Sequence, residues 1–178
     1  AVVGERLRVA MGMSLRKVTE HAPISKGVEA SVIEEKYYEP PLINVIKFAC
    51  NSCPEKRVMI TEGCQGCLEH PCVEVCPKKA VHMEGGRSHI DEDACIKCGK
   101  CLEACPYNAI IKQERPCSKA CGMNAIGSDE YGRAEIDQDK CVSCGQCLVS
   151  CPFSAIVDKG QIFQTIMALK SETPVYAI

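Results

Sequence analysis

The alternation of apolar and polar positions along the chain predicts short helices and strands joined by loops. An amphipathic pattern over residues 5–20 favours a helix, and a second helix is predicted over residues 28–38. The apolar run over residues 42–48 predicts a strand. Residues 163–170 predict a further helix near the end of the chain. The fold class expected from this pattern is α+β, with a helical extension at the N-terminus.

Two hairpins and two single helical turns complete the predicted elements. The hairpins comprise residues 81–90, turning at Gly85-Gly86, and residues 156–162, turning at Lys159-Gly160. The helical turns comprise residues 99–104 and 145–150. Elements this short bury little apolar surface, so something else must help to hold the fold together.

The composition explains what that stabilising element is. The 178 residues include 16 Cys, but no Trp, three Phe and five Tyr, although 46% of the residues count as hydrophobic. Aromatic side chains normally dominate core burial, so an ordinary apolar core is poorly supplied here. In small metal-binding domains the free energy of metal binding is also free energy of folding. The cysteines are therefore the first candidates for both structure and function.

The cysteine spacing identifies the chemistry. Cys95, Cys98, Cys101 and Cys105 form C-x2-C-x2-C-x3-C before Pro106, and Cys141, Cys144, Cys147 and Cys151 repeat the run before Pro152. This run is typical of bacterial ferredoxins, where it binds [4Fe–4S] clusters. It therefore predicts one-electron transfer.

An internal repeat organises the remaining cysteines. The pattern Cys, three residues, Ala, then Ile or Val occurs four times, starting at Cys76, Cys105, Cys121 and Cys151. The segment before Cys95 also matches the segment before Cys141. Residues 64–110 and 111–156 are therefore interpreted as two copies of one unit, each a two-cluster ferredoxin-like unit.

One arm of the second copy is displaced. The first copy contains Cys64-x2-Cys67-x4-Cys72-x3-Cys76-Pro77, whereas the second keeps Cys117-x3-Cys121 and has Gly122 in place of the proline. Cys50-x2-Cys53 is the one pair left unassigned. We infer that this pair supplies the missing arm by folding back from the N-terminal side.

A complete ligand scheme follows from one rule. In two-cluster ferredoxins the fourth cysteine of a run binds the other cluster. The rule predicts four [4Fe–4S] clusters, with two as a minimum. The sets are Cys64, Cys67, Cys72 and Cys105; Cys95, Cys98, Cys101 and Cys76; Cys141, Cys144, Cys147 and Cys121; and Cys50, Cys53, Cys117 and Cys151. Each cysteine is used once, and the fourth set rests on elimination.

The residues around the cysteines suit this chemistry. Closely spaced thiolates can wrap a cluster while backbone N–H groups donate to its sulfurs and tune its potential. Gly99 and Gly145 lie inside the loops, where a side chain would obstruct a tight wrap. Tyr107 and Phe153 follow Cys-Pro pairs and are expected to shield clusters from water by packing.

Other classes of protein remain as alternatives. Disulfides are disfavoured because no signal-peptide pattern opens the chain, and zinc because four cysteines within eleven residues are unlike its usual spaced pairs. His70 is an alternative ligand, but the cysteines already satisfy four clusters. A net charge of −2 gives no reason to expect nucleic acid, and no apolar run is long enough to span a membrane.

Several stretches together resemble a known family. Residues 63–72 with Cys76-Pro77, Arg115–Cys121, and the tail segments 161–167 and 173–178 are similar to the N-terminal region of monomeric [FeFe]-hydrogenases of the group B type. The resemblance covers most of residues 41–178 and implies a relay of electrons between ferredoxin and a catalytic H-cluster domain. That domain requires later cysteines, including a Thr-Ser-Cys-Cys-Pro-like motif, which this sequence does not contain. We therefore expect a piece of a longer protein, with no active site of its own.

The predicted organisation has four parts. Residues 1–48 form an N-terminal extension, 49–110 the first unit with the arm that serves the second, 111–160 the second unit, and 161–178 a helix and linker into the catalytic domain. The alternative within electron transfer is an iron–sulfur subunit or polyferredoxin of another oxidoreductase. A sensor whose clusters are broken by oxygen is a third hypothesis. Reduced thiols favour the cytoplasm of an anaerobe.

Overall fold

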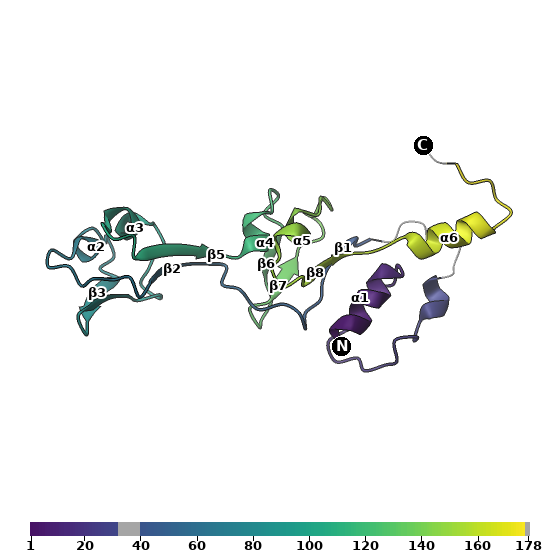
Figure 1. Ribbon diagram of the computed structural model, residues 1–178, viewed down its shortest axis with the longest axis horizontal. Coiled ribbons are helices and arrows are strands. Elements are labelled where there is room, and N and C mark those ends of the chain that lie inside the picture. The colour runs from purple at the N-terminus through teal and green to yellow at the C-terminus, as the bar shows by residue number, and fades with distance from the viewer. Residues whose placement is uncertain (32–39, 177–178) are drawn as a thin grey trace. The chain divides into compact units, whose positions relative to one another are not determined.

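The computed structural model describes residues 1–31 and 40–176, which belong to two compact units (Figure 1). Unit 1 combines Ala1–Cys53 with Pro116–Ile178, and unit 2 comprises Pro54–Arg115. Unit 2 is therefore an insertion in the sequence of unit 1. The insertion lies between Cys53 and Cys117, inside the stretch that the repeat pattern assigns to one cluster-binding motif.

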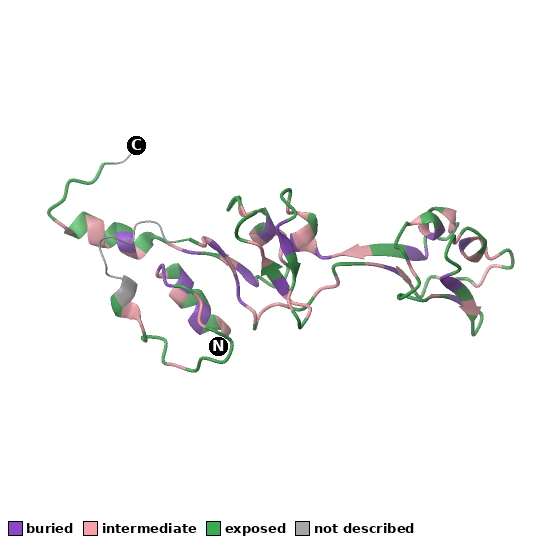
Figure 2. Ribbon diagram, turned by 180° about the vertical axis from the view of Figure 1, so that it is seen from behind, coloured by how far each residue is buried: buried purple, intermediate pink, exposed green. Residues whose placement is uncertain are grey.

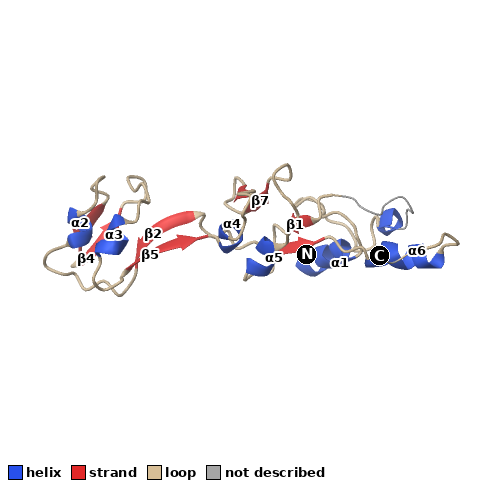
Figure 3. Ribbon diagram, turned by 90° about the horizontal axis from the view of Figure 1, so that it is seen from above, coloured by secondary structure: helices blue, strands red, loops and turns tan. Residues whose placement is uncertain are grey.

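Unit 2 contains two antiparallel strand pairs and two short helices (Figure 3). In chain order its elements are β2 (Lys56–Ile60), α2 (Pro71–Glu74), β3 (Val81–Glu84), β4 (Arg87–Ile90), α3 (Lys100–Ala104) and β5 (Ile110–Glu114). β2 and β5 pair from Lys56 opposite Glu114 to Ile60 opposite Ile110. This ladder joins the start of the inserted segment to its end.

The hairpin predicted over residues 81–90 is confirmed. β3 pairs with β4, with Val81 opposite Ile90 and Glu84 opposite Arg87. Gly85 and Gly86 have φ values of +57° and +78°. A two-residue turn of this kind requires positive φ at both central residues, which glycine adopts without strain.

Unit 1 repeats the plan of unit 2 and adds helices at both ends. Its elements are α1 (Val2–Ala10), the 3-10 turn η1 (Val28–Ser31), β1 (Ile43–Val45), α4 (Pro116–Lys119), β6 (Ile126–Ser128), β7 (Ala134–Ile136), α5 (Gln146–Ser150), β8 (Ile156–Asp158) and α6 (Ile162–Lys170). The β6–β7 hairpin corresponds to β3–β4, and the β1–β8 pair corresponds to β2–β5. Across residues 1–31 and 40–176, none of the helices combines the length and apolar character needed to span a bilayer.

Individual hydrogen bonds show how closely the two plans agree. Thr61 N donates to Ala109 O in unit 2 and Ile46 N donates to Ala155 O in unit 1, both at 2.8 Å. The strand that leads into the first cysteine of each unit thus pairs with the strand that follows the last one. The two units therefore share the same local plan of strand pairing.

The hairpin predicted over residues 156–162 is wrong. β8 pairs with β1, a strand distant in sequence, with Ile156 opposite Val45. Lys159 continues this pairing, since its N–H donates to Leu42 O at 2.7 Å. Gly160 lies against helix α1, where its N–H donates to Val9 O at 2.8 Å. The glycine therefore permits close packing and does not form a turn.

The helix predicted over residues 5–20 is shorter than expected. α1 ends at Ala10, before Gly12, which has a φ of +79°. Beyond it the chain folds back, and Arg16 donates to the buried Glu5 carboxylate from its backbone N at 2.9 Å and from Nε at 2.7 Å. Tertiary pairing thus replaces further helical turns.

The remaining predictions concern short elements. Of the helix predicted over 28–38, the described part is the 3-10 turn η1, and residues 32–38 lie outside the described residues. The strand predicted over 42–48 is the shorter β1, and the helix over 163–170 is confirmed as α6. The two helical turns are confirmed as α3 and α5.

Each unit contains buried segments (Figure 2), and cysteines form part of each small core. In unit 2 the buried cluster is Val58, Cys72, Val81, Cys101 and Ile110. In unit 1 it is Ile43, Val45, Cys117, Ile126, Ala134, Cys147 and Ile156. The positions that ordinary domains fill with large apolar side chains are thus shared here between aliphatic residues and thiols.

Replacing Gly160 with Ala tests the packing of α1 on unit 1. The new Cβ would lie 2.5 Å from Ala10 O, so backbone must move. Overpacking of about 1–3 kcal/mol predicts an unfolding temperature lower by roughly 2–10 °C, measured by circular dichroism under anaerobic conditions. Gly127→Ala is the control, because a Cβ there meets no atom within 4 Å. Equal unfolding temperatures for the two variants would contradict this packing.

Candidate metal centres

The sixteen cysteines are divided equally between the two units, eight in each. Unit 2 holds Cys64, Cys67, Cys72, Cys76, Cys95, Cys98, Cys101 and Cys105. Unit 1 holds Cys50, Cys53, Cys117, Cys121, Cys141, Cys144, Cys147 and Cys151. The displaced pair Cys50 and Cys53 therefore shares a compact unit with Cys117 and Cys151.

One small cavity in unit 2 is lined by four thiols, those of Cys64, Cys67, Cys72 and Cys105. Apolar side chains, including those of Ile60, Tyr107 and Ile110, form much of the remaining wall. Cys72 is buried at the start of α2, where Pro71 occupies the first helical position. The donor set contains no carboxylate, which suits a soft, thiolate-bound iron cluster.

The second thiol set of unit 2 gathers around Cys101. Burial raises the pKa of the Cys101 thiol, and the nearby Cys95 and Cys76 thiolates raise it further. Burial also acts to raise the pKa of Cys76, but backbone N–H groups that follow it outweigh this effect and lower the pKa overall. One of them, Ala80 N–H, donates to Cys76 Sγ at 3.2 Å. The backbone is thus arranged to stabilise a thiolate.

Unit 1 also contains a cavity lined by four thiols, those of Cys121, Cys141, Cys144 and Cys147, which correspond to the second thiol set of unit 2. Burial raises the pKa of the Cys147 thiol, and the Cys141 and Cys121 thiolates add to it, as at Cys101. Ala125 N–H donates to Cys121 Sγ at 3.3 Å. Gly122, which replaces the usual proline, leaves this arrangement unchanged.

Three of the four remaining thiols of unit 1 lie on its core. Cys117 is buried there, and Cys50 and Cys151 pack against it. Cys117 follows Pro116 at the start of α4, as Cys72 follows Pro71 at the start of α2. Cys53 follows Cys50 after two residues.

The same backbone geometry recurs in all four C-x2-C arms. The residue before the second cysteine is left-handed at Ser52, Gly66, Lys97 and Ser143, with φ of 48°, 58°, 58° and 54°. This conformation is costly for residues other than glycine, so its recurrence marks a constraint at a functional site. The displaced arm Cys50–Cys53 therefore has the local shape of the three regular arms.

A second recurring feature follows the last cysteine of each run. The third residue after it is left-handed at Lys79, Asn108, Asn124 and Ser154, with φ of 53°, 52°, 51° and 47°. The turn then directs a backbone N–H at the cysteine sulfur, as seen for Ala155 N–H and Cys151 Sγ at 3.4 Å. The repeated sequence Cys-x3-Ala is therefore a turn that supplies a hydrogen bond to a thiolate.

The displaced arm is held against the β6–β7 hairpin by several contacts. Lys47 Nζ donates to Asp129 Oδ2 at 3.1 Å and to Ala134 O at 2.9 Å. Ala134 N–H donates to Cys50 Sγ at 3.3 Å, and Ser52 Oγ to Tyr131 O at 3.4 Å. These contacts bring a segment from the N-terminal side to the last third of the chain.

Asp129 organises this anchor. Burial acts to raise its pKa, but the Arg133 N–H, the Lys47 ammonium and the Tyr131 N–H more than offset it, and the pKa lies well below the usual range. A lowered pKa means that the carboxylate is favoured in the folded state. Its contribution to stability is complete above the unfolded-state pKa of about 3.9 and is lost only as the pH falls through the lowered value.

His70 shows no link to the cavity. It is left-handed with a φ of 47° and caps α2, accepting Val73 N–H on its carbonyl oxygen at 2.8 Å. Its buried Nδ1 has no hydrogen-bond partner among the described residues, and the residues that line the cavity do not include it.

Over residues 1–31 and 40–176, no three His, Cys, Asp or Glu side chains lie close enough to share a single metal ion. A [4Fe–4S] cluster binds its four cysteines through four different iron atoms. Its ligands therefore need not lie close enough together to share a single ion.

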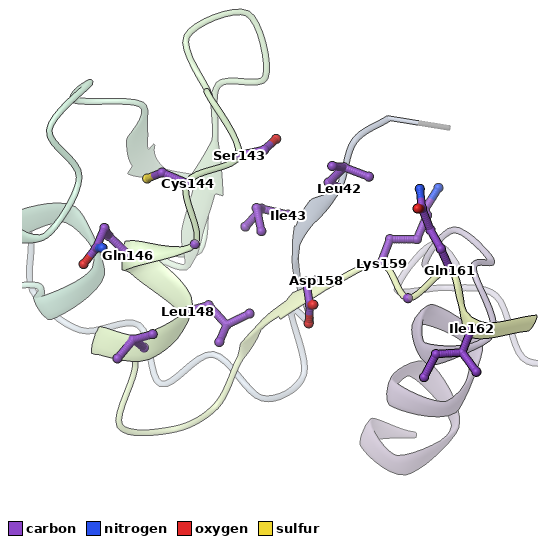
Figure 4. Close-up of a pocket in the computed structure, with 13 residues that line it drawn as sticks. Leu42, Ile43, Ser143, Cys144, Gln146, Leu148, Asp158, Lys159, Gln161 and Ile162 are labelled. Atoms are coloured by element: carbon purple, nitrogen blue, oxygen red, sulfur yellow. The ribbon is translucent and has the colours of Figure 1, made fainter. Parts of the chain in front are cut away.

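A groove in unit 1 opens beside the exposed Cys144 (Figure 4). Ile43 from β1 and Leu148 from α5 project into it, and Ile162 closes one end. Cys98 is the exposed thiol of unit 2. Each unit therefore has one exposed cysteine at which solvent or a partner can approach the site.

Sequence reasoning missed Ser88, Lys47 and Asp129. Ser88 N–H faces Cys64 Sγ at 3.5 Å, as Ala134 N–H faces Cys50 Sγ in unit 1. The repeat offset that aligns Cys95 with Cys141 also aligns Ser88 with Ala134, so this pair was detectable in the sequence. Lys47 and Asp129 have no counterpart in a motif, because they serve only the displaced arm.

Comparison with known proteins identifies the class. A protein-family model described as a 4Fe-4S dicluster domain matches residues 94–155, and a second family model with the same description matches residues 63–110. A 7Fe ferredoxin of Hydrogenibacillus schlegelii is 43% identical over 56 residues, which cover 32% of this chain and 72% of that protein. The chain belongs to the ferredoxin family of iron–sulfur electron-transfer proteins. It binds at least two [4Fe–4S] clusters and has enough cysteines for four.

Two other relatives are matched over a smaller share of their length. An uncharacterized ferredoxin of Methanocaldococcus jannaschii is 36% identical over 75 residues, which cover 35% of this chain and 45% of that protein. The electron transport protein HydN of Escherichia coli is 34% identical over 76 residues, 43% of this chain and 39% of that protein. The chain thus spans less than half the length of these two relatives.

Replacing Asp129 with Asn tests the anchor of the displaced arm. Loss of the charge that holds Lys47 should free Cys50 and Cys53, so iron content should fall by about four atoms per chain. Iron and acid-labile sulfide are measured after anaerobic purification at neutral pH. Asp139→Asn removes the same charge from an exposed turn and should retain all iron. Full iron content in the Asp129 variant would show that the arm does not depend on this contact.

Proposed function

We propose that the chain is a four-cluster electron relay. Its ligand sets are those that the sequence predicts: Cys64, Cys67, Cys72 and Cys105; Cys95, Cys98, Cys101 and Cys76; Cys141, Cys144, Cys147 and Cys121; and Cys50, Cys53, Cys117 and Cys151. Each set falls within one compact unit. The observation that carries the proposal is the common backbone geometry of the four C-x2-C arms, the displaced arm included.

The arrangement suits electron transfer in three respects. Eight thiols gather in each unit, so two clusters can lie close together there. Backbone N–H groups such as those of Ala80, Ala125 and Ala155 already point at sulfur atoms, so little reorganisation accompanies a change of charge. The exposed corners at Cys98 and Cys144 give electrons a way in and a way out.

The more specific proposal is that this relay belongs to an [FeFe]-hydrogenase. It rests on the resemblance of Arg115–Cys121 and of residues 161–167 and 173–178 to the group B type. In that assignment the relay passes electrons between ferredoxin and the H-cluster domain of the parent protein, in the cytoplasm. The chain itself supplies cluster ligands and shielding, and the catalytic domain supplies the chemistry of H2.

The second candidate is an iron–sulfur subunit or polyferredoxin of another oxidoreductase. The similarity to HydN, named as an electron transport protein, favours it. Both candidates require the same clusters and differ in the partner. They therefore predict the same metal content and different coupled activities.

The ligand scheme is tested by metal counts on paired cysteine variants. Wild-type protein should contain about sixteen iron and sixteen sulfide per chain after anaerobic purification. Cys53→Ala and Cys117→Ala should each lose about four of each, and the double variant should lose no more, because both residues serve one cluster. Cys53→Ala combined with Cys98→Ala should lose about eight. Additive losses in the Cys53 and Cys117 pair would assign these residues to different clusters.

The hydrogenase assignment is tested on the full-length natural protein. Reduced ferredoxin should drive H2 evolution, and Cys98→Ala should strongly impair it, since a lost tunnelling centre interrupts the relay. H2 evolution driven by reduced methyl viologen, which can reach a catalytic site directly, should fall much less. A full-length protein that evolves no H2 with either donor would favour the second candidate.

A further inference from the structure

A buried hydroxyl in unit 2 lies between two predicted ligands of one cluster. Ser88, on β4, is 6% exposed and lines the cavity with Cys64, Cys67, Cys72 and Cys105. Its Oγ lies 3.2 Å from Cys72 Sγ and 3.1 Å from Met83 Sδ. Its backbone N–H faces Cys64 Sγ at 3.5 Å. Ser88 thus adds a side-chain donor to a site otherwise served by backbone groups.

Unit 1 provides the same site without the hydroxyl. Ala134 holds the corresponding position on β7, where it pairs with Ser128 as Ser88 pairs with Met83. Its N–H reaches Cys50 Sγ at 3.3 Å, and it is 2% exposed. The two positions therefore share backbone, burial and neighbouring cysteine, and differ by one oxygen atom.

The ionised state of the ligand decides where the hydroxyl proton points. A cysteine bound to iron is a thiolate and carries no proton, so Ser88 must be the donor to Cys72 Sγ. The thioether of Met83 is a weak acceptor and competes poorly with a charged sulfur. The Ser88 hydroxyl is therefore expected to point at the thiolate when metal is bound.

Such a bond changes the equilibrium between redox states. Reduction adds one electron and hence negative charge to the ligand sphere, and no bond is formed or broken. A donor aimed at a ligand sulfur stabilises the more negative state and raises the reduction potential. The Ser88 proton stays on its oxygen throughout.

We propose that Ser88 raises the potential of the cluster held by Cys64, Cys67, Cys72 and Cys105 above that of its counterpart beside Ala134. Ser88 is then a positioning residue, which points its hydroxyl proton at a ligand sulfur. Because the potential of this cluster is higher, electrons reside preferentially on it, in unit 2. The inference rests on the proposed four-cluster relay and adds a direction to it. The electrons come from a low-potential carrier in the cell and from dithionite in the experiment.

The test is an anaerobic redox titration of the whole chain, with potentials read by EPR or film voltammetry. Ser88→Ala should lower one of the four potentials and leave three unchanged. The expected change is about tenfold in the ratio of reduced to oxidised cluster at a fixed potential, which is about 59 mV for a one-electron couple. Ser88→Thr, which keeps the hydroxyl, should restore the original value.

The reciprocal variant Ala134→Ser gives an independent test. It should raise a potential, and the affected cluster should be a different one from that shifted by Ser88→Ala. If both variants shift the same cluster, or if neither shifts any, the proposal is wrong. Ala134→Ser changes unit 1 and leaves unit 2 intact. If Ser88→Ala loses iron, Ala134→Ser therefore still tests whether a hydroxyl at this position raises a cluster potential.

Metal content separates this inference from the function on which it rests. Iron and sulfide are measured on each sample before titration. Fewer than four clusters in the wild-type chain would contradict the proposed relay. A complete set of clusters with unmoved potentials would overturn the role of Ser88 alone.

Discussion

In each unit, cysteine thiols occupy core positions that an ordinary domain of this size would fill with large apolar side chains. Cys72 and Cys101 are buried in unit 2, and Cys117 and Cys147 in unit 1. Buried thiols bring little apolar surface, so thiolate ligation must contribute much of the folding free energy. The short strands and single helical turns are adequate because ligation crosses between them.

Ligation also accounts for the repeated backbone strain. Non-glycine residues such as Ser52, Lys97 and Asn124 adopt left-handed conformations that cost free energy on their own. Lys97 donates its own N–H to Cys95 Sγ, and after Asn124 the N–H of Ala125 donates to Cys121 Sγ. The recurrence of one geometry in every arm explains how unit 2 can interrupt a motif of unit 1. An arm works wherever its two ends are anchored, as the contacts of Lys47 and Asp129 anchor Cys50.

Much of this could be predicted from local sequence. The hairpin over residues 81–90 follows from Gly85-Gly86, and the helical turns follow from the ferredoxin spacing. The displaced arm was inferred by elimination, because one cysteine pair had no partner. The predictions that were wrong depend on contacts between residues distant in the sequence. β8 pairs with distant β1, and α1 stops before Gly12 because Arg16 folds back onto Glu5. Apolar alternation cannot reveal which of two strands a segment will meet.

The candidate site divides in the same way. The cysteines are visible in the sequence because their spacing is strict. Lys47, Asp129 and Ser88 are not, since each acts through a contact made by folding. Comparison of the two copies of the unit recovers part of this information. Aligning Ser88 with Ala134 shows where two otherwise equivalent sites differ, and we propose that this difference gives the two clusters distinct potentials.

We propose that an arm from the N-terminal side, Cys50–Cys53, completes a cluster with residues beyond the insertion. A crystal structure of the anaerobic protein, with anomalous data collected at the iron absorption edge, tests it most directly. We expect two iron clusters in each unit, one of them bonded to Cys50, Cys53, Cys117 and Cys151. Free thiols at Cys50 and Cys53, or a cluster that joins Cys151 to Cys95, Cys98 and Cys101, would contradict it.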